Sequence, residues 1–288
     1  MSAVSDAGCS VRTARLRPVT VVSTLLMLAL AVAFVYPIAL AVMTSLKTQD
    51  EIINSPLGLP QHLDFSAYRD AWNAVGFGNL LKNSFLYAGA GSMLAVLLAV
   101  FPAYAFSRFV ILGGRTLFIL LLTTLMVPPQ TVIIPLFDFL NNTGLLDSRK
   151  GLIAVYAVYG MPFVMLLLTG FMSTVPRELE EAARVDGSGD LGVLCRVIVP
   201  LSLPAMAVAF TLNFILVWKE FIFALTFLNS DDVQPVTVGL VKFTSTQYFT
   251  AFNLPAAAVI MAQLPMVLLF IVAYRWIRSG LYVGAVKG

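Results

Sequence analysis

Six long runs of apolar residues, separated by polar segments, dominate the pattern of the chain. The runs cover residues 19–43, 83–107, 115–139, 151–173, 203–228 and 254–277. An α-helix needs roughly 20 apolar residues to cross the hydrocarbon core of a bilayer, and each run meets that length. The pattern therefore predicts an all-α integral membrane protein with six transmembrane helices.

The polar segment between the fourth and fifth runs predicts a helix-turn-helix. Glu178, Glu180 and Glu181 place negative charge near a helix N-terminus. Pro176 suits the first turn of that helix, because its missing N–H costs nothing there. Gly187 can end the helix, since glycine adopts the left-handed conformation without steric cost. A charged segment between apolar runs is expected to lie at a membrane face.

A second short helix is expected after Gly187. Ser188 could cap this helix and Pro200 could end it. Its apolar face would consist of Leu191, Leu194, Val197 and Ile198, which recur at helical spacing. The chemistry alone leaves two interpretations open, a docking element for a soluble partner or an amphipathic loop lying on the bilayer surface.

Composition excludes a soluble domain. The chain of 288 residues is 59% hydrophobic and 11% charged, with a mean hydropathy of +0.89. One soluble domain of this size cannot bury so much apolar surface. The formal net charge of +3 gives no indication of nucleic-acid binding, because membrane topology explains where the basic residues lie.

The basic residues also orient the six helices. With an internal N-terminus, eleven of them fall in cytoplasmic segments and six in external ones. Cytoplasmic loops carry the excess of lysine and arginine, so both termini are expected in the cytoplasm. The predicted organisation is a cytoplasmic tail at 1–18, a transmembrane domain at 19–279 with an external cap at 44–82 and a cytoplasmic loop at 174–202, and a cytoplasmic tail at 280–288.

The first apolar run follows three arginines and could also be a cleaved signal peptide. Its length favours a membrane helix, since the apolar core of a signal peptide has about 7–15 residues. Cys9 and Cys195 both fall on the reducing side, so no disulfide is expected. No metal site is expected either, because the single histidine, His62, stands alone in the external cap.

The helix-turn-helix resembles the EAA loop of bacterial ABC importer permeases, with which a membrane subunit docks onto its ATP-binding subunit. The resemblance rests on Glu181, Ala182, Ala183, Asp186, Gly187, Ile198 and Pro200. It implies that these residues couple the chain to an ATPase.

Other pieces narrow the resemblance to carbohydrate-uptake permeases related to the second permease subunit of the maltose importer. They are Asn83-Ser84, the stretch from Ala103 to Arg108, Pro128-Pro129-Gln130, Trp218-Lys219-Glu220-Phe221 and the terminal pentapeptide from Gly284 to Gly288. In this branch the tail reaches toward the nucleotide-binding subunits, so Gly284 and Lys287 are expected contacts. Lys219 departs from the asparagine that is common in the family.

The resemblance implies a non-catalytic, multi-pass subunit of the bacterial inner membrane that binds no cofactor itself. Its implied partners are a second, homologous permease subunit, two ATP-binding subunits that carry ATP and Mg²⁺, an extracytoplasmic solute-binding protein and membrane lipid. The cargo would be a sugar or oligosaccharide. Glycerol phosphate or another polar solute is the alternative.

Lys219 and Glu220 are the most costly residues in the apolar runs, because a charge at membrane depth must be paired or face water. They are expected either to face the cargo pathway or a subunit interface, or to satisfy each other or a partner helix. Hydrogen bonds and an aromatic face for a sugar could come from Asn213, Trp218, Tyr156, Tyr159 and Gln263. Each of these could equally hold helices together.

Two other classes of function remain open. A secondary transporter would need inverted repeats with ionisable residues in both halves, and a membrane enzyme would need a cluster of catalytic side chains. The sequence shows neither feature, which favours the importer permease.

Overall fold

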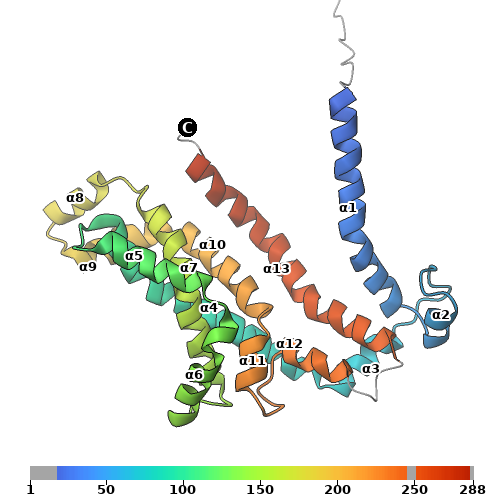
Figure 1. Cartoon of the computed structure of the whole chain (residues 1–288). Coiled ribbons are helices and arrows are strands. Elements are labelled where there is room, and N and C mark those ends of the chain that lie inside the picture. The colour runs from blue at the N-terminus through green and yellow to red at the C-terminus, as the bar shows by residue number, and fades with distance from the viewer. Residues whose placement is uncertain (1–17, 245–250, 286–288) are drawn as a thin grey trace, which may run out of the picture.

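The computed structural model of the chain describes residues 18–244 and 251–285, and every regular element within them is a helix. Four long helices stand out in Figure 1: α1 (Pro18–Ser45), α4 (Phe77–Arg108), α7 (Arg149–Met172) and α13 (Asn253–Ala285). Each is long and apolar enough to cross a bilayer. They confirm the first, second, fourth and sixth predicted spans.

The third predicted span, 115–139, is wrong as a single straight helix. It consists of α5 (Gly114–Thr123) with a 3₁₀ turn at Thr124–Met126, followed by α6 (Pro129–Asn142), and the two parts are bent by 97°. The cause is Pro128, which with the following proline forces extended backbone between the parts. Together the two parts connect the end of α4 to the start of α7.

The fifth predicted span, 203–228, has different ends in the structure. α10 covers Val199–Trp218 and is followed by a separate short helix, α11 (Ile222–Phe227). The carboxylate of Glu220 accepts hydrogen bonds from the first backbone N–H groups of α11, so the chain restarts a helix here instead of continuing α10.

The helix-turn-helix is present, with a different second half. α8 (Glu178–Val185) ends before Gly187, whose φ of +86° is left-handed as predicted. α9 (Asp190–Val193) follows, but its N-cap residue is Gly189 and makes no side-chain bond, so the cap expected from Ser188 is wrong. Pro176 precedes α8 and does not lie in its first turn.

Pro200 does not end the second helix. α9 continues through a π-helical turn, Leu194–Ile198, into α10, so that one helical path of 29 residues runs from Asp190 to Trp218. Pro200 lies in the first turn of α10. A proline is tolerated there because the π turn has already changed the hydrogen-bonding register of the backbone.

The expected external cap forms short helices. It contains α2 (Gln49–Asn54) and α3 (Ser66–Ala74), and α4 begins before the predicted end of the cap at residue 82. α12 (Val236–Gly239) and a 3₁₀ turn at Leu240–Thr244 complete the same part of the molecule.

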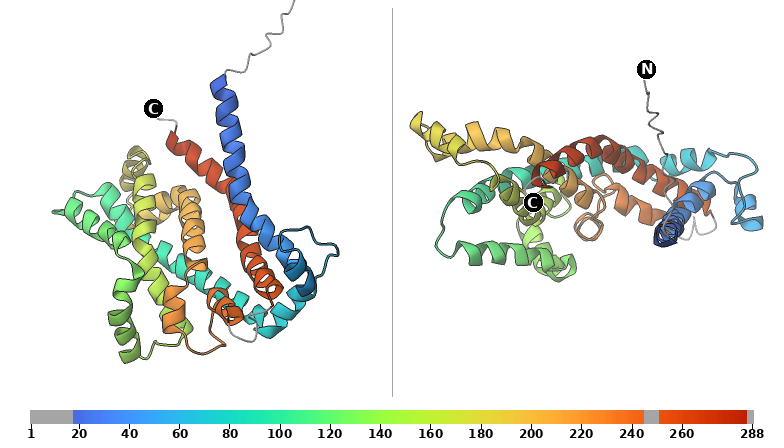
Figure 2. Two further views of the ribbon diagram at one scale, coloured as in Figure 1. Left: turned by 45° about the vertical axis from the view of Figure 1, so that its right-hand side comes forward. Right: turned by 90° about the horizontal axis from the view of Figure 1, so that it is seen from above.

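The two faces of the molecule differ in content. The α8–α9 pair, the N-terminal end of α1 and the C-terminal end of α13 lie on the upper side in Figure 1 and in the left view of Figure 2. α2, α3, α6, α11 and α12 lie on the opposite side. We call the upper side the α8–α9 face and the opposite side the α11–α12 face.

The sixth helix is longer than predicted. α13 continues past residue 277 to Ala285, so the segment 280–285 that was expected to be a tail is helical and Gly284 lies in this helix. Lys287, the other expected contact of the tail, lies outside the described residues.

The buried core surrounds α4 and α7. One group of buried side chains, which includes Phe77 and Phe223, lies toward the α11–α12 face, and another, which includes Met165 and Ile198, lies toward the α8–α9 face. α1 contributes little to either, since none of its most apolar window is buried and its contacts are mainly with α13. Its surface can be covered only by lipid or by another chain.

Candidate functional site

The α8–α9 pair projects an exposed surface from the helical core. The surface contains four of the residues predicted to couple the chain to an ATPase: Glu181, Ala182, Asp186 and Gly187. Ala183 is half-buried beneath them. Two large apolar side chains, Val185 at 88% exposure and Leu191 at 70%, add to this surface, whereas Leu194 and Ile198 from the same predicted apolar face are buried.

Ile198 and Pro200, the other two residues predicted to couple the chain to an ATPase, lie outside the exposed surface of the α8–α9 pair. Ile198 is fully buried in the core with Leu194, which positions the helix pair from beneath. Pro200 is exposed at the start of α10.

Glu180, next to the predicted docking residues, is buried and carries an ion pair. Its Oε1 lies 2.5 Å from Nε of Arg108, and both side chains are at most 5% exposed. Arg108 also donates to the carbonyl of Val175, at 2.8 Å. The last residue of α4 is thus bound both to α8 and to the link that precedes it.

The outer side of the helix pair has a second, exposed link. Arg184 donates to Oδ1 of Asp190 at 3.1 Å, which bridges α8 and α9 across the turn at Gly187. This hydrogen bond is the main cause that raises the pKa of the Arg184 guanidinium.

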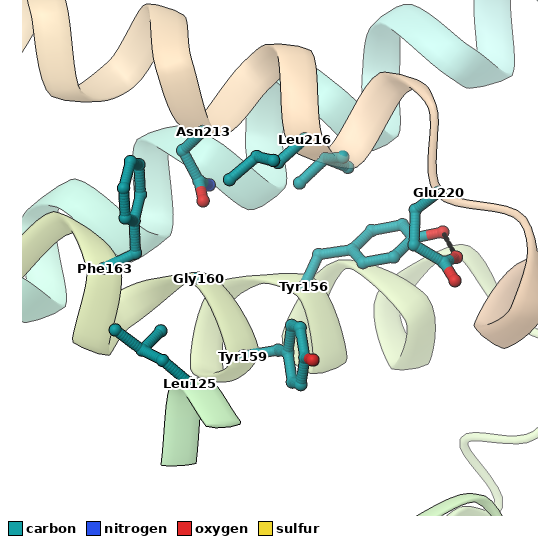
Figure 3. Close-up of a pocket in the computed structure, with 9 residues that line it drawn as sticks. Leu125, Tyr156, Tyr159, Gly160, Phe163, Asn213, Leu216 and Glu220 are labelled. Atoms are coloured by element: carbon teal, nitrogen blue, oxygen red, sulfur yellow. Dashed lines mark hydrogen bonds between the residues drawn. The ribbon is translucent and has the colours of Figure 1, made fainter. Parts of the chain in front are cut away.

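A cavity of about 320 Å³ lies between α7 and α10, at the level of the bent pair α5–α6, as Figure 3 shows. Such a volume is at the lower end of the range for small-ligand sites, roughly 300–1,000 Å³. Its lining residues are Leu125, Tyr156, Tyr159, Gly160, Phe163, Asn213, Leu216, Val217 and Glu220. Four of them were singled out from the sequence.

Glu220 and Tyr156 form one wall of the cavity. The hydroxyl of Tyr156 donates to Oε2 of Glu220 at 2.7 Å (Figure 3). Phe223 N–H donates to Oε1 at 2.9 Å and Ala224 N–H to Oε2 at 3.3 Å. Three donors therefore stabilise the carboxylate at this depth. Glu220 makes no ion pair with Lys219 among the described contacts; its bond to Tyr156 on α7 agrees instead with the alternative that a neighbouring helix satisfies it.

Asn213 forms the opposite wall. Its Nδ2 donates to Oγ of Ser92 on α4 at 3.0 Å. A Cβ added to Gly160 would lie 2.5 Å from Oδ1 of Asn213, so glycine is required for α7 and α10 to approach this closely. Figure 3 shows the amide of Asn213 directed toward α7, with its oxygen beside the cavity.

The other residues expected in the pathway lie elsewhere. Trp218 is buried and its Nε1 donates to the Ala262 carbonyl at 3.3 Å, which joins α10 to α13. Lys219 and Gln263 are exposed, and neither lines the cavity. In the described parts of the chain, no group of three or more histidine, cysteine, aspartate and glutamate residues is placed to hold a metal ion.

Comparison with known proteins decides the family. Residues 91–281 match the model of the binding-protein-dependent transport system inner membrane component. The chain belongs to this family. Its members are the membrane permease subunits of ABC importers that work with a binding protein, so a helical, membrane-embedded permease is established for the chain.

Individual relatives agree with that assignment. The chain is 31% identical over 267 residues to the diacetylchitobiose uptake system permease protein NgcG of Streptomyces coelicolor, covering 92% of this chain and 88% of NgcG. It is 31% identical to the melibiose/raffinose/stachyose import permease protein MelC of Bacillus subtilis, covering 96% of this chain and all of MelC.

A solved structure shows the same fold. A chain of a bacterial ABC transporter involved in the import of the acidic polysaccharide alginate superposes with a TM-score of 0.78 at 25% identity, covering 88% of this permease and 95% of that chain. The helical fold, with five long apolar helices and one bent helix pair in the described residues, is thus compatible with a known importer.

Sequence reasoning missed two features of these sites. It used Arg108 for topology and for the family resemblance, but did not anticipate its buried carboxylate partner. It left Glu220 open between the pathway and a structural pair, and did not anticipate that this residue begins α11. A polar residue three positions before Phe223, with a new apolar stretch after it, is also the pattern of a helix start.

Proposed function

We propose that this permease subunit imports a neutral sugar or oligosaccharide, with ATP hydrolysed on partner subunits. The observation that carries the cargo proposal is the cavity between α7 and α10. Its tyrosine rings give a sugar apolar faces to stack on, and Asn213 and Glu220 supply acceptors for hydroxyl groups.

The charge of the cavity favours a neutral polyol over the alternative cargo, glycerol phosphate. The lining includes a carboxylate, Glu220, and no lysine or arginine. A phosphate would meet a negative charge there with no cation to neutralise it. The names of the relatives, which concern oligosaccharide import, support the same choice.

The α8–α9 pair is proposed as the docking element for an ATP-binding subunit. Its support is the combination of exposed charge, exposed apolar side chains and a rigid base in the core. In an assembled importer two ATP-binding subunits with ATP and Mg²⁺, a homologous permease and an extracytoplasmic binding protein would complete the complex. The α8–α9 face would then be cytoplasmic, as would both termini.

Co-purification followed by transport tests this function. The tagged permease should retain a second permease and an ATPase, and the complex in liposomes should take up a sugar only with ATP inside and binding protein outside. Ligand screening of that binding protein would name the sugar. Binding of glycerol phosphate and of no neutral sugar would replace the proposed cargo with the alternative.

Cysteine labelling tests the orientation. In a background with Cys9→Ser and Cys195→Ser, a cysteine at Ser188 should react with a membrane-impermeant reagent only from the cytoplasm, and a cysteine at Ser66 only from outside. Reversed accessibility would contradict the orientation but would leave the family assignment intact.

A further inference from the structure

α4 is the one described helix whose two ends are each fixed by buried polar side chains to an opposite face of the molecule. It runs without interruption over 32 residues, including Pro102. At about 1.5 Å per residue, roughly 38 Å separate Asn83, near its start, from Arg108 at its end.

At the α8–α9 face the contact is the Arg108–Glu180 pair. The two side chains come from the last turn of α4 and the first turn of α8. Each charge is favourable at its own helix terminus, because a cation suits a C-terminus and an anion suits an N-terminus. Arg108 also binds the Val175 carbonyl, so α8 cannot shift relative to α4 without breaking buried bonds.

At the α11–α12 face, α4 holds the backbone of the loop at 232–236. Asn83 Nδ2 donates to the carbonyls of Asp232 at 2.8 Å and Gln234 at 3.0 Å. The hydroxyl of Tyr87 donates to the Val233 carbonyl at 2.6 Å. Oγ of Ser84 accepts from the Val236 N–H at 2.8 Å, and these three side chains of α4 are at most 2% exposed.

We propose that α4 is the mechanical link between the two faces, with Arg108 and Glu180 as positioning residues at one end and Asn83, Ser84 and Tyr87 at the other. A displacement of the α8–α9 pair reaches the 232–236 loop through one rigid helix. Conversely, a contact made on that loop from outside shifts the helix pair. This rests on the proposed function, which places an ATPase at the first end and the outer surface at the second.

The link makes the ATPase responsive to the external partner. By thermodynamic reciprocity, a partner that biases the loop must bias the helix pair by the same free energy. The measurable quantity is the factor by which loaded binding protein stimulates ATP hydrolysis in the reconstituted four-component complex. Merely structural residues would lower basal and stimulated hydrolysis together through loss of complex, and would leave this factor unchanged.

Two double variants cut the link at its two ends. Arg108→Met with Glu180→Met removes both charges together, which avoids stranding one of them in the core. Asn83→Ala with Tyr87→Phe removes three of the bonds to the loop. Each should lower the stimulation factor by about fivefold or more, and the Asn83→Ala/Tyr87→Phe variant should do so with basal hydrolysis per assembled complex at the wild-type level. Tyr87→Phe alone should give an intermediate factor.

Matched controls are available away from α4. Tyr68→Phe removes the hydroxyl that lies 2.7 Å from Oγ of Ser45 and joins α3 to α1. Asp231→Asn breaks an exposed ion pair with Lys242. Both should keep the wild-type stimulation factor.

The outcomes separate this inference from the proposed function. If the wild-type complex shows no ATP-driven uptake, the proposed function fails. If wild type is coupled and either double variant assembles with a wild-type factor, α4 is not the link. If the Arg108→Met/Glu180→Met variant does not assemble, the other end of α4 decides. A wild-type stimulation factor in both Asn83→Ala/Tyr87→Phe and Tyr87→Phe would then overturn the inference.

Discussion

The hydroxyl of Tyr156 on α7 lies 2.7 Å from a carboxylate oxygen of Glu220, just beyond the end of α10. One bond therefore closes a wall of the cavity, and the same carboxylate begins α11. In the proposed function, cargo binding would therefore depend on the same two residues as the local helix geometry.

Tyr156→Phe should lower both stability and sugar affinity. The variant removes a hydrogen bond to an ionised group, worth about 1.5–3 kcal/mol, and leaves the shape of the ring unchanged. Thermal unfolding of the detergent-solubilised complex and the concentration dependence of uptake measure the two effects. Tyr159→Phe is the control, because its hydroxyl makes only a long contact of 3.4 Å to the Val127 carbonyl. Equal effects of the two variants would contradict the role of the Tyr156–Glu220 bond.

Gly160→Ala should push α7 and α10 apart and impair uptake. Its Cβ would lie 2.5 Å from Oδ1 and 2.8 Å from Nδ2 of Asn213, closer than real contacts allow. Overpacking of this kind costs typically about 1–3 kcal/mol. Gly170→Ala lies in the same helix with nothing within 4 Å of the added carbon, and should be neutral or stabilising by up to about 1 kcal/mol. Melting temperatures of the two variants that did not differ would refute this packing account.

Gly187→Val should uncouple transport, with Glu181→Ala acting more weakly. The left-handed φ of +86° costs a β-branched residue about 1 kcal/mol or more, although space around the added carbon is open. Strain would therefore distort the turn without disturbing the core. Gly189→Val is the control, since its φ of −74° suits any residue. The assay is uptake per ATP hydrolysed, and a wild-type ratio for Gly187→Val would exclude the turn from coupling.

Lys219→Ala should leave sugar affinity and complex assembly unchanged. The side chain is exposed at the end of α10 and lies outside the cavity, and truncation of an exposed side chain usually changes stability by less than about 0.5 kcal/mol. Uptake measured over a range of sugar concentrations tests the affinity, and co-purification of the partner subunits tests the assembly. A changed affinity in an intact complex would restore Lys219 to the pathway, as the sequence suggested.

Stability should fall in acid through Asp147. Hydrogen bonds from the Ser230 hydroxyl, and then from backbone N–H groups, hold the pKa of Asp147 below its ordinary value of 3.8. A carboxylate with a depressed folded pKa stabilises the protein above its unfolded pKa, and this contribution is lost as the pH falls below about 3.8.

Asp147→Asn isolates this contribution. Asparagine tolerates the left-handed backbone found there, with φ of 53°, but does not ionise. The difference in melting temperature between wild type and this variant should therefore stay constant from pH 6 to about 4 and shrink as the pH falls further below 3.8. A difference that also stayed constant below pH 3.8 would show that the Asp147 charge does not stabilise the loop contact.

The sequence places most of the long apolar helices because apolar length alone decides where a helix can cross a bilayer. It fails where a local group competes with that pattern. Pro128 breaks the third apolar run although both adjacent residues are apolar, and the Glu220 side chain starts α11 within a run that looks continuous. Local hydrogen bonding and proline sterics act on single residues, which a composition window averages away.

The sites were predicted unevenly for a similar reason. Glu181 and Gly187 are exposed, and their local pattern was sufficient to place them on one turn. The Arg108–Glu180 pair joins residues far apart in the chain, and α4 must pack against the base of α8 before the pair can be recognised. Tyr156, Asn213 and Glu220 were named individually, but only the packing of α7 on α10 shows that they share one cavity.

The break between α5 and α6 also restricts which surroundings this part of the chain can have. A helix bent by 97° at Val127–Pro128 interrupts the ladder that normally hides backbone amides from hydrocarbon, and Met126 beside it is 82% exposed. Lipid offers no hydrogen bond to such a gap. In the proposed importer, another protein chain packed over the bend would keep these backbone groups away from lipid.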